Sequence, residues 1–454
     1  MNRKRAALVT LAAASSLVLV AACGSSGGSA DTKNIDFSGT AKATLNAWAF
    51  NGADDVGKAR IADVQKFLKG VDIKYDYTAF DSQKFTTRLA SGNVPDVIQM
   101  DSTYVPTYAA QGIILPLDKC FSQNNVDPQQ RFYKSIVDDV TYQGHIWGVP
   151  QFYQPNAIIL NKDVMDAAGV TDDEIDTSKP DVLLAAIKKM YQSNGGVPNV
   201  MGFNAVPTGF YYQWVVGLGG QLVDSSGKPT LDDPSNVYPL QFLKKIADAQ
   251  GGFAKDKSFT DSFDAFGDQN QFVKNQVGSE VDAQWYPNVL SPYKNQINIE
   301  AVPFKDKDGN PVSVTTDQAF VIPAKGSNPV AACDYALRLT AMQDWVAAEK
   351  ARVQTLQKNG GVNTGLFTGS PEADKAIHSK YVKSSGNPGF DQVINTYYDV
   401  VGDGKTIGAS PAGQAIQQAL LNAITTTLLG QSSPQAALGQ AQQQAMHAYD
   451  TVAN

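Results

Sequence analysis

The spacing of apolar residues along the chain predicts alternating strands and helices. Residues 43–49 alternate between apolar and polar side chains, as in a half-buried strand, and residues 55–69 carry apolar side chains at helical spacing. Residues 71–79 alternate again. The three segments together predict two parallel strands joined by a right-handed helical crossover, which is the building unit of an α/β fold.

The same pattern continues through the rest of the chain. It predicts a helix over 81–91 that ends at Gly92, and a short buried strand over 95–100. Further helices are predicted over 179–193, 234–249, 329–343, 372–385, 389–401, 411–429 and 434–451, and further strands over 145–150, 156–161, 297–302 and 318–323. An α/β protein without internal repeats is therefore expected.

The first residues have the pattern of an export signal. Residues 1–5 are basic, and residues 6–22 are an unbroken run of Ala, Leu, Val, Ser and Thr, shorter than the roughly 20 residues that span a bilayer. Small residues precede Cys23, and a Gly/Ser-rich segment follows it. This arrangement resembles the lipobox of bacterial lipoproteins, which implies a signal peptide over 1–22, a Cys23 acylated with chains such as palmitate, and a flexible tether over 23–36. The alternative is a secretory signal whose cleavage site adjoins a buried cysteine.

Composition and charge exclude several classes of protein. With 43% hydrophobic and 18% charged residues, the chain is neither disordered nor collagen-like. A length of 454 residues predicts two or three compact units. The net charge of −7 becomes −10 when Arg3, Lys4 and Arg5 leave with the signal peptide, and an acidic protein repels phosphate backbones. No nucleic-acid partner is expected.

Cysteine, histidine and acidic residues do not form a recognised catalytic or metal motif. The three cysteines and three histidines have no zinc-ligand spacing, so neither a metal nor a cofactor is predicted. In an oxidising compartment, Cys120 and Cys333 either form a disulfide or stay as two buried thiols. Acidic residues are plentiful, so the paired carboxylates of a glycoside hydrolase remain an alternative.

Several sequence blocks resemble one protein family. They are Ser91-Gly92-Asn93-Val94-Pro95-Asp96-Val97, Leu115-Pro116-Leu117-Asp118, Gly144-His145-Ile146-Trp147-Gly148-Val149-Pro150, Asn161-Lys162-Asp163, Gly219-Gly220-Gln221-Leu222-Val223-Asp224 and residues 318–338. In content and order these blocks are similar to those of extracellular solute-binding proteins of ABC importers, in particular carbohydrate binders like the maltose- and oligosaccharide-binding proteins. The sequence departs from the family pattern at 177–181, where a tryptophan is usual.

The resemblance implies a two-lobe, periplasmic-binding-protein-like α/β fold, with hinge strands between the lobes and the ligand in the cleft. Lobe 1 is expected to comprise residues 37–150 plus about 300–340, and lobe 2 residues 151–299 plus about 341–454. It also implies a monomer on the extracellular face of the cytoplasmic membrane. Its implied partners are a carbohydrate ligand, the transmembrane subunits of an ABC permease, and the membrane through the lipid anchor.

Aromatic residues in polar, turn-like stretches indicate where a sugar would bind. A sugar ring has an apolar face that stacks on aromatic rings and a rim of hydroxyl groups that needs polar side chains. Trp48 lies at the C-terminal end of a predicted strand and Trp285 shortly before Pro287, so both are expected to stack on the ligand, while Asp101 is expected to bind hydroxyl groups. The predicted ligand-binding residues are Trp48, Asn51, Asp101, Tyr104, Trp147, Tyr153, Tyr212, Trp214, Trp285 and Tyr286. For each aromatic residue the alternative is a place in the hydrophobic core.

The predicted function is capture of a mono- or oligosaccharide and its delivery to a permease, without catalysis. Binding of another polar solute, such as a polyol or glycerol phosphate, is an alternative. A phosphorylated solute would require arginine or lysine at the cleft, and the candidate clusters contain neither.

Overall fold

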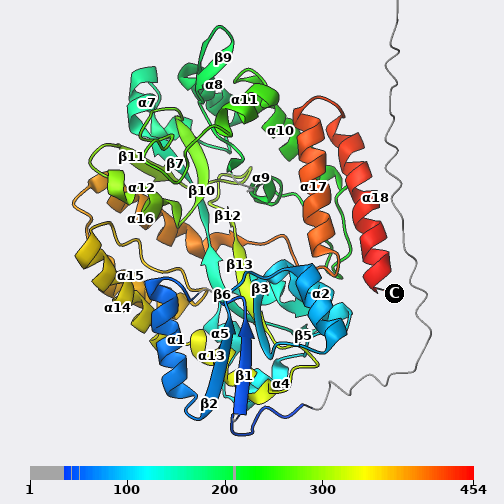
Figure 1. Ribbon diagram of the computed structural model, residues 1–454. Helices are drawn as coiled ribbons and strands as arrows, with labels where there is room; N and C mark the ends of the chain where they lie inside the picture. Colours follow the sequence, from blue (N-terminus) through cyan, green and yellow to red (C-terminus); the bar gives the residue numbers. More distant parts are fainter. Residues whose placement is uncertain (1–34, 42, 51, 208–210, 454) are drawn as a thin grey trace, which may run out of the picture.

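Two separate β-sheets divide the molecule into two lobes. The computed structural model describes residues 35–41, 43–50, 52–207 and 211–453. The sheet strands are β1 (Ala43–Trp48), β2 (Val71–Asp76), β3 (Val97–Asp101), β6 (Val149–Gln154), β7 (Asn156–Asn161), β10 (Ser279–Ala283), β11 (Ile299–Val302) and β13 (Thr316–Val321). Lobe 1 holds the order β2-β1-β3-β13-β6, and lobe 2 holds the order β10-β7-β11 (Figure 1). The predicted two-lobe α/β fold is confirmed.

The direction of the strands in lobe 1 follows from the predicted crossover unit. β1 is parallel to β2 and β3, whereas β13 is antiparallel to β3 and β6. Helix α1 (Asp55–Phe67) connects β1 to β2 and is capped by Asp54, whose side chain accepts a hydrogen bond from the backbone N–H of Gly57. The carboxyl ends of the three parallel strands face lobe 2 (Figure 1). Ligands of open α/β sheets bind at such strand ends.

Helices surround both sheets. Lobe 1 carries α1, α2 (Ser82–Ser91), α3 (Val105–Ala110), α4 (Asp118–Gln123), α5 (Pro128–Arg131), α6 (Lys134–Asp139), α13 (Pro329–Leu339), α14 (Met342–Asn359) and α15 (Pro371–Tyr381). Lobe 2 carries α7 (Lys162–Ala168), α8 (Pro180–Met190), α9 (Tyr211–Gly217), α10 (Val237–Asp248), α11 (Phe253–Thr260), α12 (Tyr286–Leu290), α16 (Pro388–Val400), α17 (Gly413–Leu428) and α18 (Pro434–Ala453). Within the described ranges, no helix combines the length and the apolar character that crossing a membrane requires.

Short paired strands complete the structure. They are β4 (Thr141–Tyr142) with β5 (His145–Ile146), β8 (Gln192–Asn194) with β9 (Val197–Val200), and β12 (Ser313–Val314) with β14 (Gly404–Lys405). The pair β12 and β14 lies beside the point where the chain passes into β13 (Figure 1).

The chain passes between the lobes at Pro155, between β6 and β7, and at Thr315, between β12 and β13. It also passes from lobe 1 to lobe 2 between α15 and α16, because α14 packs on α1 and α15, whereas α16 packs on β11 and β7. The predicted boundary near residue 340 is therefore wrong for α14 and α15, which lie with lobe 1. Their sequence alone could not assign them, since only the packing partner distinguishes one lobe from the other.

The C-terminal helices give the lobes a further contact. α17 and α18 pack on each other and on α10 of lobe 2, and they run along the side of the molecule toward lobe 1 (Figure 1). There the hydroxyl of Thr107 donates to the carbonyl of Pro411 at 2.9 Å, and the side-chain amide of Gln414 donates to the hydroxyl of Thr103.

A disulfide joins Cys120 of α4 to Cys333 of α13. Both residues are buried in the core of lobe 1. Of the two alternatives left open by the sequence, the structure has the disulfide, and it links chain segments 213 residues apart.

Candidate functional site

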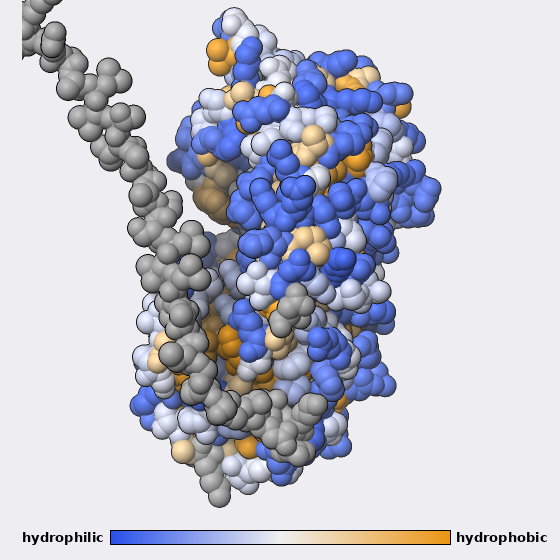
Figure 2. Space-filling view, turned by 90° about the vertical axis from the view of Figure 1, so that its right-hand side faces the viewer, coloured by the Kyte–Doolittle hydropathy of each residue, from blue (hydrophilic) through white to orange (hydrophobic). Residues whose placement is uncertain are grey.

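A cavity of about 320 Å³ lies where the two lobes meet. We call it the interlobe cavity. It is lined by Asp54, Val56, Gly57, Arg60, Gln99, Gln318 and Arg352 of lobe 1, by Phe152 and Gln154 of β6, the hinge strand that leads to the crossing at Pro155, by Gln284, Trp285 and Asn288 of lobe 2, and by Gly365, Leu366 and Phe367. Figure 2 shows a recess in the outline of the molecule at the level where its two halves meet.

Side-chain amides dominate the polar lining of this cavity. Gln99 on β3 and Gln318 on β13 hydrogen-bond to each other through their amide groups. The Oε1 atoms of Gln99 and Gln284 are buried and have no hydrogen-bond partner among the described residues. Since buried polar atoms are normally hydrogen-bonded, these acceptors are suited to a ligand that brings hydroxyl or N–H donors.

Two arginines that were not predicted from the sequence also line the interlobe cavity. Arg352 pairs with Asp55, with Nη2 2.9 Å from Oδ1, and with Asp54 at 3.2 Å. Partial burial alone would raise the pKa of Asp55, but the hydrogen bond and the charge of Arg352 hold it below its usual value. Arg60 is only 1% exposed and pairs with Asp344 at 3.0 Å. Each positive charge at the cavity is thus already matched by a carboxylate.

The hinge strand contributes Phe152 in an uncommon backbone conformation. Its φ is +53°, in the left-handed region that bulky residues rarely adopt. The ring packs edge-on against Trp345 at 5.2 Å, and the guanidinium of Arg60 lies 5.4 Å from the ring centre. Local strain of this kind is often found at sites that bind or move, and here it coincides with the hinge.

A second cavity, of about 560 Å³, lies within lobe 2. We call it the lobe 2 cavity; its walls come from α10, α11, α17, β10, the segment between Met201 and Pro207, and Tyr211. Trp285 lines both cavities and therefore marks their junction. Its ring lies nearly parallel to that of Phe266, at 6.1 Å and 12°. Phe266 is 67% exposed, so the pair presents an accessible aromatic surface.

Of the predicted ligand-binding residues, the structure brings Trp285 and Tyr286 to these cavities. Trp285 is half-buried directly before α12. Tyr286 is buried, and its hydroxyl is engaged by Asn270 and Gln271, each at 2.7 Å. Trp285 is therefore the available aromatic face, while Tyr286 supports the wall behind it.

The structure corrects the prediction for Trp48, because its ring is packed in the core of lobe 1. The side chain is 1% exposed and lies against Phe80 and Phe85, with ring centres 5.3 and 6.2 Å away. The guanidinium of Arg88 lies 4.4 Å from the ring centre, and the indole N–H donates to Thr78 at 3.2 Å. No face of Trp48 is free for a ligand in this conformation.

Trp214 and Tyr153 are core residues as well. Trp214 is fully buried, and its indole N–H donates to the carbonyl of Ala205 at 2.6 Å. Tyr153 is stacked on Tyr133 at 4.8 Å, and its hydroxyl lies 2.8 Å from that of Ser135. Both predictions of ligand contact are contradicted by this burial.

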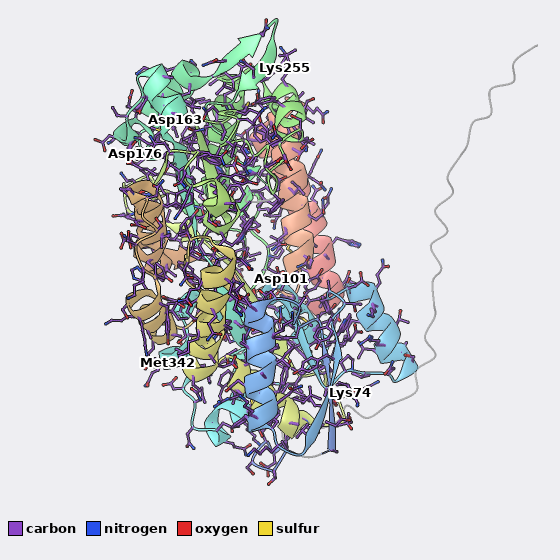
Figure 3. All side chains as sticks on the ribbon, turned by 60° about the vertical axis from the view of Figure 1, so that its left-hand side comes forward. Lys74, Asp101, Asp163, Asp176, Lys255 and Met342 are labelled. Carbon is purple, nitrogen blue, oxygen red and sulfur yellow. A yellow bond between two sulfur atoms is a disulfide. The ribbon has the colours of Figure 1, made fainter. Side chains whose placement is uncertain are left out.

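Among the remaining predicted residues, those that the structure describes line neither cavity. Figure 3 shows Asp101 at the level where the lobes meet, but its carboxylate caps the turn that follows, accepting from the N–H of Thr103 at 2.9 Å. Tyr104 packs against Phe80, and the indole N–H of Trp147 donates to the carbonyl of Tyr142. Burial raises the pKa of Tyr212 to about 12, as expected of a packed tyrosine. Asn51 lies outside the described residues.

Sequence reasoning missed Gln99, Gln318 and Arg60. A signal for the first was present, because Gln99 interrupts the apolar run Val97–Met100 of a buried strand. A polar residue in such a strand must find a hydrogen-bond partner or face a polar cavity. Arg60 gave no comparable signal, since an arginine in a helix is most often exposed.

A buried acid pair at the hinge predicts that stability depends on pH. Asp139 of α6 and Asp317 of β13 are buried side by side, and the hydroxyl of Ser102 donates to Asp317 at 2.6 Å. Burial raises both pKa values, that of Asp139 to about 7, and the charge of Asp139 raises the pKa of Asp317 further. The folded state therefore binds more protons than the unfolded state between about pH 4 and 7, so stability falls as the pH rises through this window.

Asp139→Asn should make the urea midpoint less dependent on pH between pH 5 and 8 than in the unsubstituted protein, because the variant has no proton to lose at this position. An equally steep loss of stability in the variant would contradict the assignment.

Comparisons with known proteins place this geometry in a family. Residues 52–353 match the family described as bacterial extracellular solute-binding protein. The chain is 26% identical over 292 residues to the diacetylchitobiose binding protein DasA of Streptomyces coelicolor, covering 62% of this chain and 64% of that protein. It is 27% identical over 182 residues to an arabinooligosaccharide-binding protein of Halalkalibacterium halodurans, covering 39% of this chain and 38% of that protein.

Solved structures agree with the fold. The structure of CpMnBP1 with mannotriose bound gives a TM-score of 0.70 at 23% identity, covering 89% of this chain and all of that chain. The GacH receptor of Streptomyces glaucescens gives a TM-score of 0.65 at 19% identity, covering 90% of this chain and 99% of that one. Since the family match extends over both lobes and their hinge strands, the chain belongs to the bacterial extracellular solute-binding proteins.

Proposed function

We propose that this protein binds a mono- or oligosaccharide between its lobes as the substrate-binding component of an ABC importer. The observation that carries the proposal is the interlobe cavity, where unpartnered amide acceptors face the same space as the half-buried ring of Trp285. This combination fits the hydroxyl rim and the apolar face of a sugar. The names of two sequence relatives, which state binding of diacetylchitobiose and of arabinooligosaccharide, support a carbohydrate.

A phosphorylated solute has less support. Such a ligand calls for an arginine or lysine that is free to bind phosphate. Among the described residues that line the interlobe cavity, the two arginines are paired with Asp54, Asp55 and Asp344. A thermal-shift panel of neutral sugars, polyols and glycerol phosphate tests this, because a ligand at 100 times its Kd adds about 2.7 kcal/mol of stability. Stabilisation by glycerol phosphate alone would overturn the choice of a sugar.

Trp285→Ala should weaken saccharide binding by about 1–3 kcal/mol in free energy and change the melting temperature little, because the half-buried ring offers its face to the ligand. Calorimetry and an unfolding curve on the same variant measure both quantities. Trp147→Ala is the matched control, since that half-buried ring lines neither cavity and should leave affinity unchanged. Intact affinity in Trp285→Ala would remove this residue from the site.

The family supports a location outside the cytoplasm, and we extend the proposal to a lipid anchor at Cys23 and delivery to membrane permease subunits. One acyl chain holds a protein only marginally on a membrane, so stable anchoring requires more than one. Cys23→Ser should release the protein from the membrane fraction with its saccharide binding intact. A variant that stays in that fraction at high salt would refute the anchor.

Binding without turnover is also part of the proposal. Prolonged incubation with oligosaccharides that bind should give no cleavage products by chromatography, and shorter products would identify a glycosidase instead.

A further inference from the structure

The lobe 2 cavity combines apolar walls with buried carboxyl groups. Its hydrocarbon lining includes Leu243, Ile246, Phe253, Phe263, Leu421 and Leu428. Asp256 of α11 and Glu280 and Asp282 of β10 line the same space and are buried. Carboxyl groups are rarely buried without a partner, because removing them from water is costly. Apolar packing does not offset this cost, so the presence of three carboxyl groups at an apolar cavity suggests a role in binding.

Polar atoms at this cavity lack partners. Asp256 is only 6% exposed, and its Oδ1 has no hydrogen-bond partner among the described residues. The same holds for Oε1 of Gln271, whose Nε2 donates to Glu280 at 3.1 Å. Oε1 of Gln271 is an acceptor, and Oδ1 of Asp256 is an acceptor when the carboxyl group is ionised. They therefore suit a ligand group that brings several hydrogen-bond donors.

The balance of charge favours a cation. Lys257 is the cationic side chain among the described residues of the lining, and it pairs with Asp261 at 2.7 Å. Burial raises the pKa of both Glu280 and Asp282, and the charge of Glu280 raises that of Asp282 further. Burial and the nearby Asp248 raise the pKa of Asp256 to about 8. This carboxyl thus lacks a positive partner that would stabilise its charged form.

We propose that the lobe 2 cavity binds a protonated amino group of the saccharide, with Asp256 as its carboxylate partner, so that the ligand class is an amino-sugar oligomer. The inference rests on the proposed function, because Trp285 joins this cavity to the interlobe cavity.

An ammonium group on a sugar ring fits the walls better than the alternatives. The described residues contain no group of three or more His, Cys, Asp or Glu side chains that could hold a metal ion. Hydrocarbon walls accommodate the C–H groups around the amine, and the aromatic rings of Trp285, Phe266 and Tyr211 attract a cation through their faces. A neutral hydroxyl would leave Asp256 without a counter-charge.

The test compares three oligosaccharide series of equal length that differ at one substituent per ring. They are β-1,4-linked glucosamine, N-acetylglucosamine and glucose oligomers, measured by calorimetry at neutral pH and physiological salt. Glucosamine oligomers should bind about 10- to 100-fold more tightly than the other two, the range expected of a hydrogen bond to a charged group. Asp256→Asn should remove this preference, so that the three series bind with similar affinity.

Asp248→Asn is the matched control. It makes the same change in net charge nearby, but Asp248 lies outside both cavities, with its side chain paired to Lys244. The preference for glucosamine should therefore survive in this variant. Its loss in both variants would indicate long-range attraction by an acidic protein, and overturn the site.

Other outcomes separate this inference from the proposed function. If neutral oligomers bind as tightly as glucosamine oligomers, the amine site is wrong and the saccharide proposal stands. If a preference for glucosamine persists in Asp256→Asn, the amine is bound elsewhere. If no saccharide in any series binds, the proposed function itself fails.

Discussion

Arg60→Ala is expected to lower the free energy of unfolding by about 3–5 kcal/mol, because the substitution leaves a buried carboxylate without its partner. The Nε of Arg60 is 3.0 Å from Asp344, and Nη2 donates to Gln151 at 2.8 Å and to the carbonyl of Leu339 at 2.7 Å. The guanidinium also lies 3.8 Å from the ring centre of Trp345. One side chain thus connects α1, the hinge strand β6 and the start of α14. The measurement is a denaturant midpoint.

Arg338→Ala is the control for this effect. Arg338 forms a comparable pair with Asp63 at 2.7 Å, but both side chains are about one-fifth exposed. Partly exposed pairs contribute roughly 0–1 kcal/mol, so the control should lose much less stability. Equal losses of stability in the two variants would show that burial of the Arg60–Asp344 pair does not determine the size of the loss.

The order of strands and helices was largely predictable, because it depends on local periodicity. β1, α1, β2, α2 and β3 lie within three residues, at each end, of the segments expected from alternation and helical spacing. α14 was missed because its buried side is a narrow strip of Asp344, Trp345, Ala348 and Glu349, in which two of the four residues are acidic. A helix with so narrow an apolar face gives a weak periodic signal.

The candidate site was less predictable, because burial decides which aromatic residues face a ligand. Trp48, Trp214 and Trp285 have similar polar neighbours in sequence, yet the first two are enclosed by other aromatic rings and only the third lines a cavity. Asp101 follows its strand as expected, but its carboxylate caps the next turn. Such contacts come from segments far apart in the chain. Gln99 and Gln318, for example, are 219 residues apart and meet only through the pairing of β3 with β13.

Replacing both Cys120 and Cys333 by alanine is expected to lower the free energy of unfolding by about 2–5 kcal/mol. The disulfide closes a loop between residues 213 positions apart, so its loss restores much conformational freedom to the unfolded chain. Saccharide affinity should be unchanged, because neither cysteine lines a cavity.

Guanidinium unfolding of the double variant, compared with the unsubstituted protein unfolded with and without a reductant, separates the effect of the cross-link from that of the lost sulfur atoms. If the cross-link matters, the reduced protein should unfold near the midpoint of the double variant. If instead the midpoints of the oxidised protein and the double variant coincide, the link between α4 and α13 does not stabilise lobe 1, and hydrophobic packing around these two helices would account for its stability alone.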